Sequence, residues 1–535
     1  MTTRPPVPRN EPVLSYGPGT PERGELLSAL AAHQPEELPL WIGGEPVHTG
    51  DRQPFYAPHD HRRKLGEASL ASAAEIARAL EATTEARASW AARSQAERSR
   101  VFLRAAELLS GPFRQRLNAA TLLNQSKTIQ QAEIDAACEL CDFFRFNVSF
   151  ADGLMESQPY SPPGVWNRLE ARPLDGFVYA ITPFNFTSIA ANLPAAPALM
   201  GNTVLWKPSP SAMLSAHRVM ELFTLAGLPP GVINLVNGDA AAITQQALTH
   251  RDFAGLHYTG STTVFRSLWG QIAAELPRYR SYPRLVGETG GKDFILAHPS
   301  ADPQALAAAI VLGGFEYQGQ KCSAASRVYL PRSLWTATRE RALEILREVT
   351  LGDPADLRHF MGAVIHEGAF ERISGAISRG LSDPRVTLVA GGGCHREVGW
   401  FIEPTLLLVD DPSHALMTEE LFGPVVSVLV YDDDRFEQVL RWVDQSDYAL
   451  TGAVFARDAS ALAQMDRALR FAAGNYYVND KPTGAVVGQQ PFGGGRLSGT
   501  NDKAGSPHNL TRWMSLRTVK ETFVPRTGWR YPHQD

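Results

Sequence analysis

The residue of this chain best suited to covalent chemistry is Cys322, in the segment Gly319-Gln-Lys-Cys-Ser-Ala324. Small residues around a thiol let a substrate approach the sulfur, and the thiolate is the nucleophilic form. The other cysteines, Cys138, Cys141 and Cys394, are expected to be buried and structural. The Cys138-x-x-Cys141 spacing has no second pair, so it gives little support to a zinc or disulfide-exchange site.

Two polar side chains could assist that thiol. Glu288 lies in the glycine-rich segment Val286-Gly-Glu-Thr-Gly-Gly-Lys292, where a carboxylate could act as general base toward a later water. Asn185, in Thr182-Pro-Phe-Asn-Phe186, could donate its amide to a developing oxyanion. Taken alone, each has a structural alternative, namely a surface charge or helix cap for Glu288 and a turn for Asn185.

Two segments that follow predicted strands could contact a dinucleotide. Leu205–Ser209 contains Lys207, and Tyr258–Thr262 contains Gly260 and Ser261, which would open a helix and direct backbone N–H groups at a phosphate. The chain has no Gly-x-Gly-x-x-Gly sequence there, so the residues alone give a weak nucleotide signal. A Ser-His-Asp pattern and a His-Glu-x-x-His motif are also missing, and no metal site is expected.

The elements that must position these residues follow a strand–helix–strand pattern from about Gly176 to Glu288. The predicted strands are 177–181, 204–206, 232–236, 256–258 and 285–286, and one helical face is formed by Val219, Leu222, Phe223 and Ala226. Such alternation predicts a parallel, doubly wound sheet. A second α/β unit is predicted from about Gly290 to Gln490, with strands at 328–330, 425–430 and 476–478.

Three other features accompany these units. The proline-rich start of the chain, through Pro21, is expected to run over the surface as an extended arm. Capping boxes at Ser72-x-x-Glu75 and Ser94-x-x-Glu97 predict two covering helices, the second ending at Gly111. The segment Trp166–Ile181 is predicted to be a hairpin that turns at Asp175-Gly176 and serves an oligomer contact.

Composition narrows the class of protein. With 535 residues, 44% hydrophobic and 20% charged, the chain is an ordinary globular protein and not a disordered one. Its net charge of −5 argues against binding to nucleic acid or to an anionic membrane, and its longest apolar stretch is too short to span a bilayer. Because no secretory or mitochondrial leader is visible, a cytoplasmic location with free thiols is expected.

Taken in order, several motifs resemble those of the aldehyde dehydrogenase superfamily. They are Pro183-Phe-Asn185, Trp206-Lys-Pro208, Gly260-Ser261, Glu288-Thr-Gly-Gly-Lys292, Gly319-Gln-x-Cys322, Glu420-Leu-Phe-Gly-Pro424 and Pro491-Phe-Gly-Gly494. Together they span most of the chain, and the joint match is far more specific than any one of them. The resemblance implies an α/β protein with the aldehyde dehydrogenase fold: a Rossmann-like, doubly wound NAD domain, an α/β catalytic domain and a β-hairpin oligomerisation element.

The resemblance also implies boundaries and assembly. The NAD-binding domain would comprise residues 1–154, with the N-terminal arm, and 176–290, and the catalytic domain 291–490. Residues 155–175 and 508–535 would form the oligomerisation element, and 491–507 would return to the NAD domain. The chain would then be a homodimer or higher homo-oligomer acting on a small molecule.

Within the superfamily the chain most resembles the branch that oxidises L-glutamate γ-semialdehyde to L-glutamate in proline catabolism. The stretches that carry this resemblance are Asn10-Glu-Pro-Val13, Ser15–Gly24, Gly319–Ala324, Pro482–Ala485, Val487–Gly494 and Ser498–Asp502. It implies that Cys322 attacks the aldehyde carbon and that Asn185 and the Cys322 backbone N–H hold the oxyanion. Hydride would pass to NAD, and Glu288 would activate water to hydrolyse the thioester.

Binding residues follow from the same resemblance. The implied cofactor contacts are Thr182, Lys207, Gly260, Ser261, Thr262, Thr263, Val264, Glu420 and Phe422. The implied substrate contacts are Ser323, Gly484 and Ala485 for the carboxylate, Phe186 and Phe492 for the aliphatic stem, and Glu139 for the amine. Pro210 in place of a ribose-binding Glu leaves the choice between NAD and NADP open, and Phe265 in place of Gly implies altered helix packing.

Three alternatives stay open on the sequence. The substrate could be another semialdehyde, such as succinate semialdehyde or the aminoadipate homologue, since one methylene is worth only about 1–3 kcal/mol in a pocket. A CoA-acylating enzyme is disfavoured because it would not need Glu288. A scaffold that retains only the fold is disfavoured because all the expected catalytic positions are intact.

Overall fold

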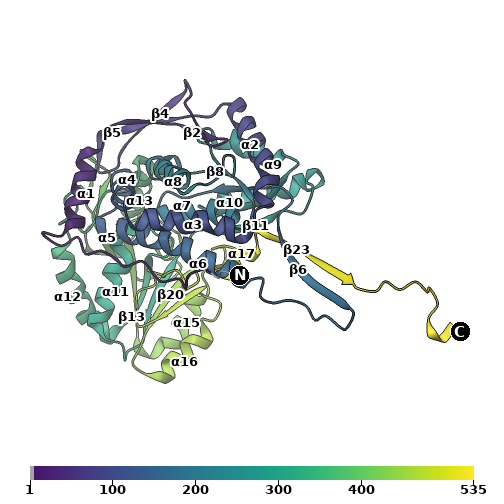
Figure 1. Ribbon diagram of the computed structural model, residues 1–535. Coiled ribbons are helices and arrows are strands. Elements are labelled where there is room, and N and C mark those ends of the chain that lie inside the picture. The colour runs from purple at the N-terminus through teal and green to yellow at the C-terminus, as the bar shows by residue number, and fades with distance from the viewer. Residues whose placement is uncertain (1–4, 535) are drawn as a thin grey trace.

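Two seven-stranded sheets organise the chain in the computed structural model, which describes residues 5–534 (Figure 1). The first sheet has the order β11-β10-β7-β8-β9-β2-β3, and the second has the order β14-β17-β18-β13-β12-β20-β21. Each sheet is covered by helices on both faces, which confirms the predicted α/β class and the two successive α/β units.

The parallel core of the first sheet confirms the doubly wound prediction. Its parallel strands are β7 (Phe177–Ile181), β8 (Thr203–Lys207), β9 (Ile233–Leu235), β10 (Phe253–Thr259) and β11 (Arg284–Glu288). Two short strands, β2 (Leu40–Ile42) and β3 (Glu45–Val47), extend the edge antiparallel. The covering helices are α2 (Ala73–Ala91), α3 (Gln95–Ser110), α4 (Arg114–Gln125), α6 (Leu140–Gly153), α7 (Thr187–Leu199), α8 (Met213–Ala226), α9 (Ala240–Thr249) and α10 (Thr262–Glu275).

Alternation along β7 explains how both faces are buried. Phe177 and Tyr179 pack into the core beneath α2, α9 and α10, whereas Val178 and Ala180 pack into the core beneath α3, α6, α7 and α8. The predicted helix starts are also confirmed, because Ser72 and Ser94 form capping boxes at α2 and α3 and Gly111 caps the end of α3. Ser261 caps α10, as the Gly260-Ser261 pair predicts.

The second sheet is built in the same way. Its strands are β12 (Asp293–Ala297), β13 (Ala325–Pro331), β17 (Thr405–Val409), β18 (Val425–Tyr431), β20 (Thr451–Phe455), β21 (Asn475–Val478) and the antiparallel edge strand β14 (Val386–Ala390). The helices on its faces are α11 (Pro303–Phe315), α12 (Arg332–Glu348), α13 (Glu367–Leu381), α15 (Phe436–Asp444) and α16 (Ala459–Ala468).

Smaller elements join the two units. A three-stranded sheet is formed by β1 (Glu36–Leu38), β5 (Asp60–Ser69) and β4 (Arg52–Ala57). The short pieces are α5 (Ile129–Ala132), α14 (Ala415–Thr418), α17 (Pro507–Thr511), β15 (Cys394–His395), β16 (Phe401–Ile402), β19 (Tyr448–Ala449) and β22 (Gly495–Arg496). A π-helix, Glu133–Glu139, lies between α5 and α6, and π-helical turns are frequent at functional sites.

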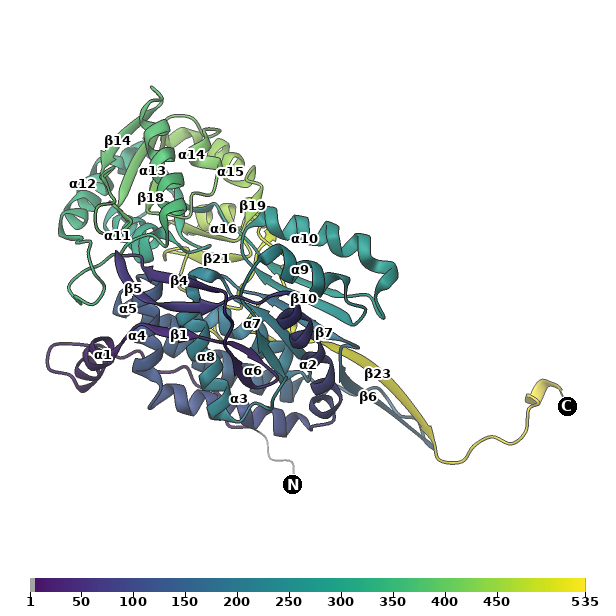
Figure 2. The same cartoon turned by 90° about the horizontal axis from the view of Figure 1, so that it is seen from above.

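The predicted local hairpin at Trp166–Ile181 is wrong. Strand β6 (Val165–Pro173) pairs antiparallel with β23 (Met514–Thr522), and this two-stranded ribbon projects from the body of the molecule (Figures 1 and 2). The second half of the expected hairpin is β7, whose apolar residues are buried in the parallel sheet. The Asp175-Gly176 pair therefore leads the chain into that sheet, and a Cβ on Gly176 would lie 2.1 Å from the Asp252 carbonyl oxygen.

The N-terminal arm differs from its prediction in two respects. Helix α1 (Pro21–Ala32) begins at a proline that was assigned to the extended arm, because proline is well tolerated in the first helical turn. The arm is also tied to the body, since Tyr16 is only 4% exposed. Across residues 5–534, no helix has both the length and the apolar character needed to cross a membrane.

Candidate active site

Cys322 lies where two cavities meet, between the two sheets. One cavity has a volume of about 230 Å³ and the other about 570 Å³, and Cys322 lines both. It is followed by β13 and preceded by a tight turn in which Tyr317, Gln318 and Gly319 have φ angles of 52°, 55° and 63°. A Cβ on Gly319 would lie 2.3 Å from the Gly423 carbonyl oxygen, so only glycine fits there.

Glutamine side chains fix this turn. The Gln318 amide donates to the carbonyl oxygens of Ser126 and Ala363 at 3.0 and 2.8 Å, and the Gln320 amide oxygen accepts from the Ile365 N–H at 2.9 Å. These bonds connect the turn to two other segments, at residue 126 and at residues 363–365, so the thiol is presented from a rigid support.

The resting state of Cys322 is the thiol. Burial raises its pKa well above the ordinary value, and the carboxyl groups of Asp293, Glu288 and Glu420 raise it further. A proton acceptor must therefore act as the sulfur reacts. The other cysteines confirm the structural prediction only in part, since Cys138 and Cys141 are buried whereas Cys394, on β15, is half-buried.

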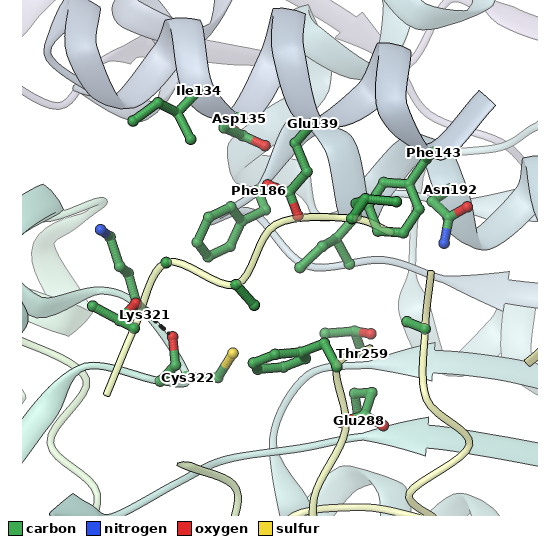
Figure 3. Close-up of a pocket in the computed structure, with 18 of the residues that line it drawn as sticks. Ile134, Asp135, Glu139, Phe143, Phe186, Asn192, Thr259, Glu288, Lys321 and Cys322 are labelled. Atoms are coloured by element: carbon green, nitrogen blue, oxygen red, sulfur yellow. Dashed lines mark hydrogen bonds between the residues drawn. The ribbon is translucent and has the colours of Figure 1, made fainter. Parts of the chain in front are cut away.

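Glu288 ends β11 and lines the smaller cavity together with Cys322 (Figure 3). Its Oε2 atom is buried and has no hydrogen-bond partner among the described residues. Burial raises the pKa of this carboxyl well above the ordinary value, Asp502 raises it further, and Lys503 opposes the shift. A buried carboxyl with a raised pKa and one unbonded oxygen, in a cavity shared with a thiol, is the type of group that can exchange a proton with a bound molecule.

Asn185 follows β7 and lines the larger cavity beside Cys322. It is 4% exposed, and its Nδ2 donates to the Gln320 carbonyl oxygen at 3.1 Å. This bond sets the amide plane against the turn that carries Cys322, while the second N–H of the same amide can donate to another oxygen.

The smaller cavity contains all the substrate contacts implied by the resemblance. It is lined by Glu139, Phe186, Ser323, Gly484, Ala485 and Phe492 in addition to Cys322 and Glu288. The Ser323 and Thr483 hydroxyls are 2.8 Å apart, and Gly484 has a φ of 98°, which favours glycine. The lining also includes Lys321 and Thr483, which the sequence reasoning missed although each adjoins a residue it named.

The helical wall of this cavity carries a buried ion pair. Lys127 donates to Asp135 at 2.7 Å, and its ammonium lies 4.2 Å from the centroid of the Phe186 ring. Glu139 reaches into the cavity from the same wall, opposite Cys322 and Glu288 (Figure 3). Burial and the Asp135 carboxylate raise the pKa of Glu139 to about 8, against the opposing charge of Lys127.

The larger cavity has the donor set that a dinucleotide requires. The cofactor residues that line it are Thr182, Lys207, Gly260, Ser261, Val264, Glu420 and Phe422. Burial alone lowers the pKa of Lys207, so hydroxyl acceptors would satisfy its ammonium. The exposed N-terminal turn of α10 offers N–H groups to a phosphate, and Glu420 is held by the Gly291 N–H at 2.9 Å.

Two of the expected cofactor residues do not line this cavity. The Thr262 hydroxyl donates to the Leu497 carbonyl oxygen at 3.3 Å, and Thr263 is exposed on α10. Successive helical residues point about 100° apart, so the whole segment 260–264 cannot face one ligand. Pro210 lines the cavity at the position where many NAD-preferring relatives would have a ribose-binding Glu. This position therefore offers no carboxylate to the ribose.

Comparisons with known proteins agree with this geometry. A sequence model described as the aldehyde dehydrogenase family matches residues 47–519. The delta-1-pyrroline-5-carboxylate dehydrogenase, mitochondrial, of Emericella nidulans is 49% identical, over 99% of this chain and 94% of that protein. The Homo sapiens protein of the same name is 46% identical, over 98% of this chain and 94% of that protein.

Solved structures give the same result. The delta-pyrroline-5-carboxylate dehydrogenase of Mycobacterium tuberculosis, bound with NAD, has a TM-score of 0.97 and 53% identity, covering 100% of this chain and 99% of that one. A 1-pyrroline-5-carboxylate dehydrogenase from Thermus with bound NAD has a TM-score of 0.91 and 32% identity, covering 98% and 100%.

The expected cytoplasmic location is wrong by these comparisons. The relatives from Emericella nidulans, Mus musculus, Homo sapiens and Dictyostelium discoideum are all named as mitochondrial proteins. The expectation rested only on the lack of a visible leader in the printed sequence, and that absence carries no weight against these names.

Proposed function

This chain belongs to the aldehyde dehydrogenase family, and from that premise we propose that it oxidises L-glutamate γ-semialdehyde to L-glutamate with NAD. The semialdehyde is the open form of 1-pyrroline-5-carboxylate. The observation that carries the proposal is the position of Cys322, at the junction of a cavity with dinucleotide donors and a cavity closed by a loop of small residues.

The nucleophile is Cys322. Its sulfur attacks the aldehyde carbon, a C–S bond forms, and the carbonyl oxygen becomes an oxyanion. The thiol proton leaves during this step and would pass to water in the cavity, so that Glu288 acts only in the later hydrolysis.

The oxyanion is stabilised by fixed donors. The second amide N–H of Asn185 and the backbone N–H of Cys322 are the donors we assign, and the Asn185 bond to Gln320 holds the first of them in place. Because both groups are set before the substrate arrives, no reorganisation is needed as the charge develops.

Residues of the larger cavity hold the cofactor. Lys207 and Glu420 would bind its ribose hydroxyls, and the first turn of α10 at Ser261 would bind its pyrophosphate. NAD, when bound, supplies the acceptor for the hydride that leaves the tetrahedral carbon, which leaves a thioester on Cys322.

Glu288 completes the cycle. It takes a proton from a water that attacks the thioester carbon, the C–S bond breaks, and L-glutamate leaves. The raised pKa of Glu288 makes it a strong enough base for this step once it has lost its own proton.

Residues that line the smaller cavity would select the substrate. The Ser323 hydroxyl and the backbone N–H groups of Gly484 and Ala485 are donors for the α-carboxylate, and Phe186 and Phe492 would enclose the carbon chain. Glu139 is the anion on the opposite wall, and it would pair with the α-ammonium group.

We also propose that residues 1–154 and 176–290 act as the NAD-binding domain and 291–490 as the catalytic domain, with 491–507 returning between them. The β6–β23 ribbon and residues 508–535 would form the contact of a homodimer or higher homo-oligomer. This is supported by the way the ribbon projects and by its exposed Trp166 and Leu516 (Figure 2). Light scattering that gave a monomer at micromolar concentration would contradict the assembly.

The experiment for the function is a spectrophotometric assay. Purified protein with NAD and 1-pyrroline-5-carboxylate should form NADH, with a higher kcat/KM than for succinate semialdehyde or the aminoadipate homologue. The Cys322→Ala variant should form none. Failure of the wild type on this substrate, or turnover by the alanine variant, would contradict the proposed function.

A further inference from the structure

The proposed chemistry makes no use of the extended segment Asn10–Tyr16, which lies outside both cavities. We propose that this segment is a brace that holds together the two walls of the substrate cavity, and that Asn10 is a positioning residue for recognition of the substrate carboxylate. The inference rests on the proposed function, and it concerns which residues keep the binding loop in place.

Two separate parts of the chain form the walls in question. The helical wall is the π-helix and the start of α6, which contribute Asp135, Glu139 and Phe143 to the cavity lining. The loop wall is residues 484–490, which contributes Gly484, Ala485, Val487 and Gln490. Two of the proposed carboxylate donors, the backbone N–H groups of Gly484 and Ala485, lie on the loop wall, so the position of this wall relative to the helical wall would fix the length of substrate that fits.

The amide of Asn10 bonds to both walls at once. Its Nδ2 donates to Asp142 Oδ2 on α6 at 2.8 Å and to the Val487 carbonyl oxygen in the loop at 2.8 Å. Its Oδ1 accepts from Gln489 Nε2, also in the loop, at 2.9 Å. The Asn10 side chain therefore uses both its amide nitrogen and its amide oxygen to connect the loop wall to the helical wall.

The residues that follow Asn10 fasten the arm to the helix. The Glu11 backbone N–H donates to Asp142 Oδ1 at 2.7 Å, and its carboxylate accepts from Arg114 and Arg145, each at 2.6 Å. Arg114 also donates to the Pro12 carbonyl oxygen at 2.8 Å. Glu11 is thereby held between two guanidinium groups, and this fixes the position of the adjacent Asn10.

A second anchor lies nine residues before Asp142, at the fully buried Glu133. Its carboxylate accepts from the Leu14 N–H at 2.9 Å, from the Tyr16 hydroxyl at 2.8 Å and from Asn118 at 2.8 Å, and it is paired with Arg114. The arm thus contacts residues 133 and 142, whereas residues 135, 139 and 143 line the cavity. The arm lies behind the helical wall and away from the substrate.

Loss of the Asn10 amide would free the loop without touching the reacting groups. The Val487 carbonyl and the Asp142 carboxylate would lose a donor, and Gln489 an acceptor. Cys322, Asn185 and the cofactor cavity contact none of these atoms. The expected consequence is weaker binding of a substrate carboxylate with unchanged chemistry, because small displacements of positioning groups act strongly on binding and alignment.

The test compares Asn10→Ala with Val7→Ala, a matched change at an arm residue that is 85% exposed. The KM for 1-pyrroline-5-carboxylate should rise about tenfold in Asn10→Ala, and the inhibition constant of L-glutamate should rise by a similar factor. The kcat and the KM for NAD should stay within about twofold, and Val7→Ala should match the wild type. A fall in kcat with both KM values unchanged would mean a merely structural role and would overturn the inference.

Two further variants keep the inference falsifiable if Asn10→Ala does not fold. Gln489→Ala removes only the loop side of the brace, and it should raise the same KM by a smaller factor. Asn10→Asp keeps the shape but loses both donated bonds and faces Asp142 with a like charge, so it should be at least as impaired as Asn10→Ala. Wild-type behaviour of either variant contradicts the inference, whereas lack of turnover by the wild type contradicts the proposed function instead.

Discussion

The Glu288 carboxyl and the Cys322 thiol share one cavity, and the charge of the first raises the pKa of the second. Burial raises the pKa of both groups as well. Loss of one proton from such a pair makes loss of the other harder. The nucleophile and the base are therefore coupled, and they must act in sequence.

This coupling predicts that Glu288→Gln makes Cys322 more reactive. Removing the carboxylate lowers the thiol pKa, so the pH midpoint of Cys322 alkylation by iodoacetamide should move to lower pH. The measurement is the alkylation rate against pH, with Cys322 followed by peptide mass spectrometry and Cys394 as the internal control. A midpoint that stays in place or moves upward would show that the two groups do not interact.

The same variant should fail after the first half of the reaction. With no carboxylate to activate water, Glu288→Gln should release a burst of NADH close to one per active site and then turn over about 10²–10⁴-fold more slowly than the wild type. Stopped-flow absorbance measures both phases. Equal steady-state rates in the two proteins would remove Glu288 from its assigned role.

Asn185→Ala should lose stabilisation of the oxyanion. We expect kcat to fall about 10²–10³-fold with little change in the KM for NAD, because the amide acts on charge that develops during the reaction. Single-turnover NADH formation isolates that step. If the step kept its wild-type rate while Asn185→Ala stayed folded by circular dichroism, the amide would have no such function.

The pKa of about 8 for Glu139 predicts a pH-dependent preference for the α-ammonium group. The ionised carboxylate attracts the ammonium and the protonated one does not, so the preference should be weak below the pKa and grow as pH rises through about 8. The measurement is the ratio of kcat/KM for glutamate semialdehyde to that for succinate semialdehyde, which lacks the amine, from pH 6.5 to 9. Using a ratio cancels the titration of Cys322 and Glu288.

Glu139→Gln is the matched control for that profile. The glutamine keeps the shape of the side chain but cannot ionise, so the ratio should be flat with pH. A wild-type slope that persists in Glu139→Gln would mean that another group selects the amine.

Ala485→Asp should weaken binding of the substrate carboxylate. The new anion would lie on the wall that carries the proposed donors, where it would repel the like charge of the substrate carboxylate. We expect the KM for 1-pyrroline-5-carboxylate to rise more than tenfold, a threshold that corresponds to about 1.4 kcal/mol. Ala485→Ser, a neutral change of similar size, should have a much smaller effect; equal effects of the two variants would exclude a charge-based cause.

Local sequence patterns predicted the elements that depend on near neighbours. The capping boxes at Ser72 and Ser94 and the N-cap at Ser261 are formed because each bond spans only a few residues. The parallel strands of the first sheet and β13, β18 and β21 of the second were predicted from their short apolar runs, since strands buried on two faces are mostly apolar. Strands β12, β14, β17 and β20 were not predicted. The smaller cavity likewise contains each predicted substrate residue.

Elements that depend on contacts between residues far apart in the sequence were not predicted. Strand β6 pairs with β23, which lies more than 300 residues later, and no local signal records that partner. The π-helix Glu133–Glu139 has an ordinary helical sequence, and its residues Glu133 and Asp135 bond to residues outside the helix. The arm at Asn10 looked like surface chain because its polar bonds are made to α6 and to a loop near residue 488.

The most direct measurement is mass spectrometry of the intact protein and of its proteolytic peptides, after an acid quench during turnover of 1-pyrroline-5-carboxylate and NAD by Glu288→Gln. We predict a glutamyl adduct on the peptide that contains Cys322, approaching one per chain, and none in Cys322→Ala. An unmodified Cys322 in samples where NADH has formed would contradict the covalent mechanism, and with it the assignment of this cysteine as the nucleophile.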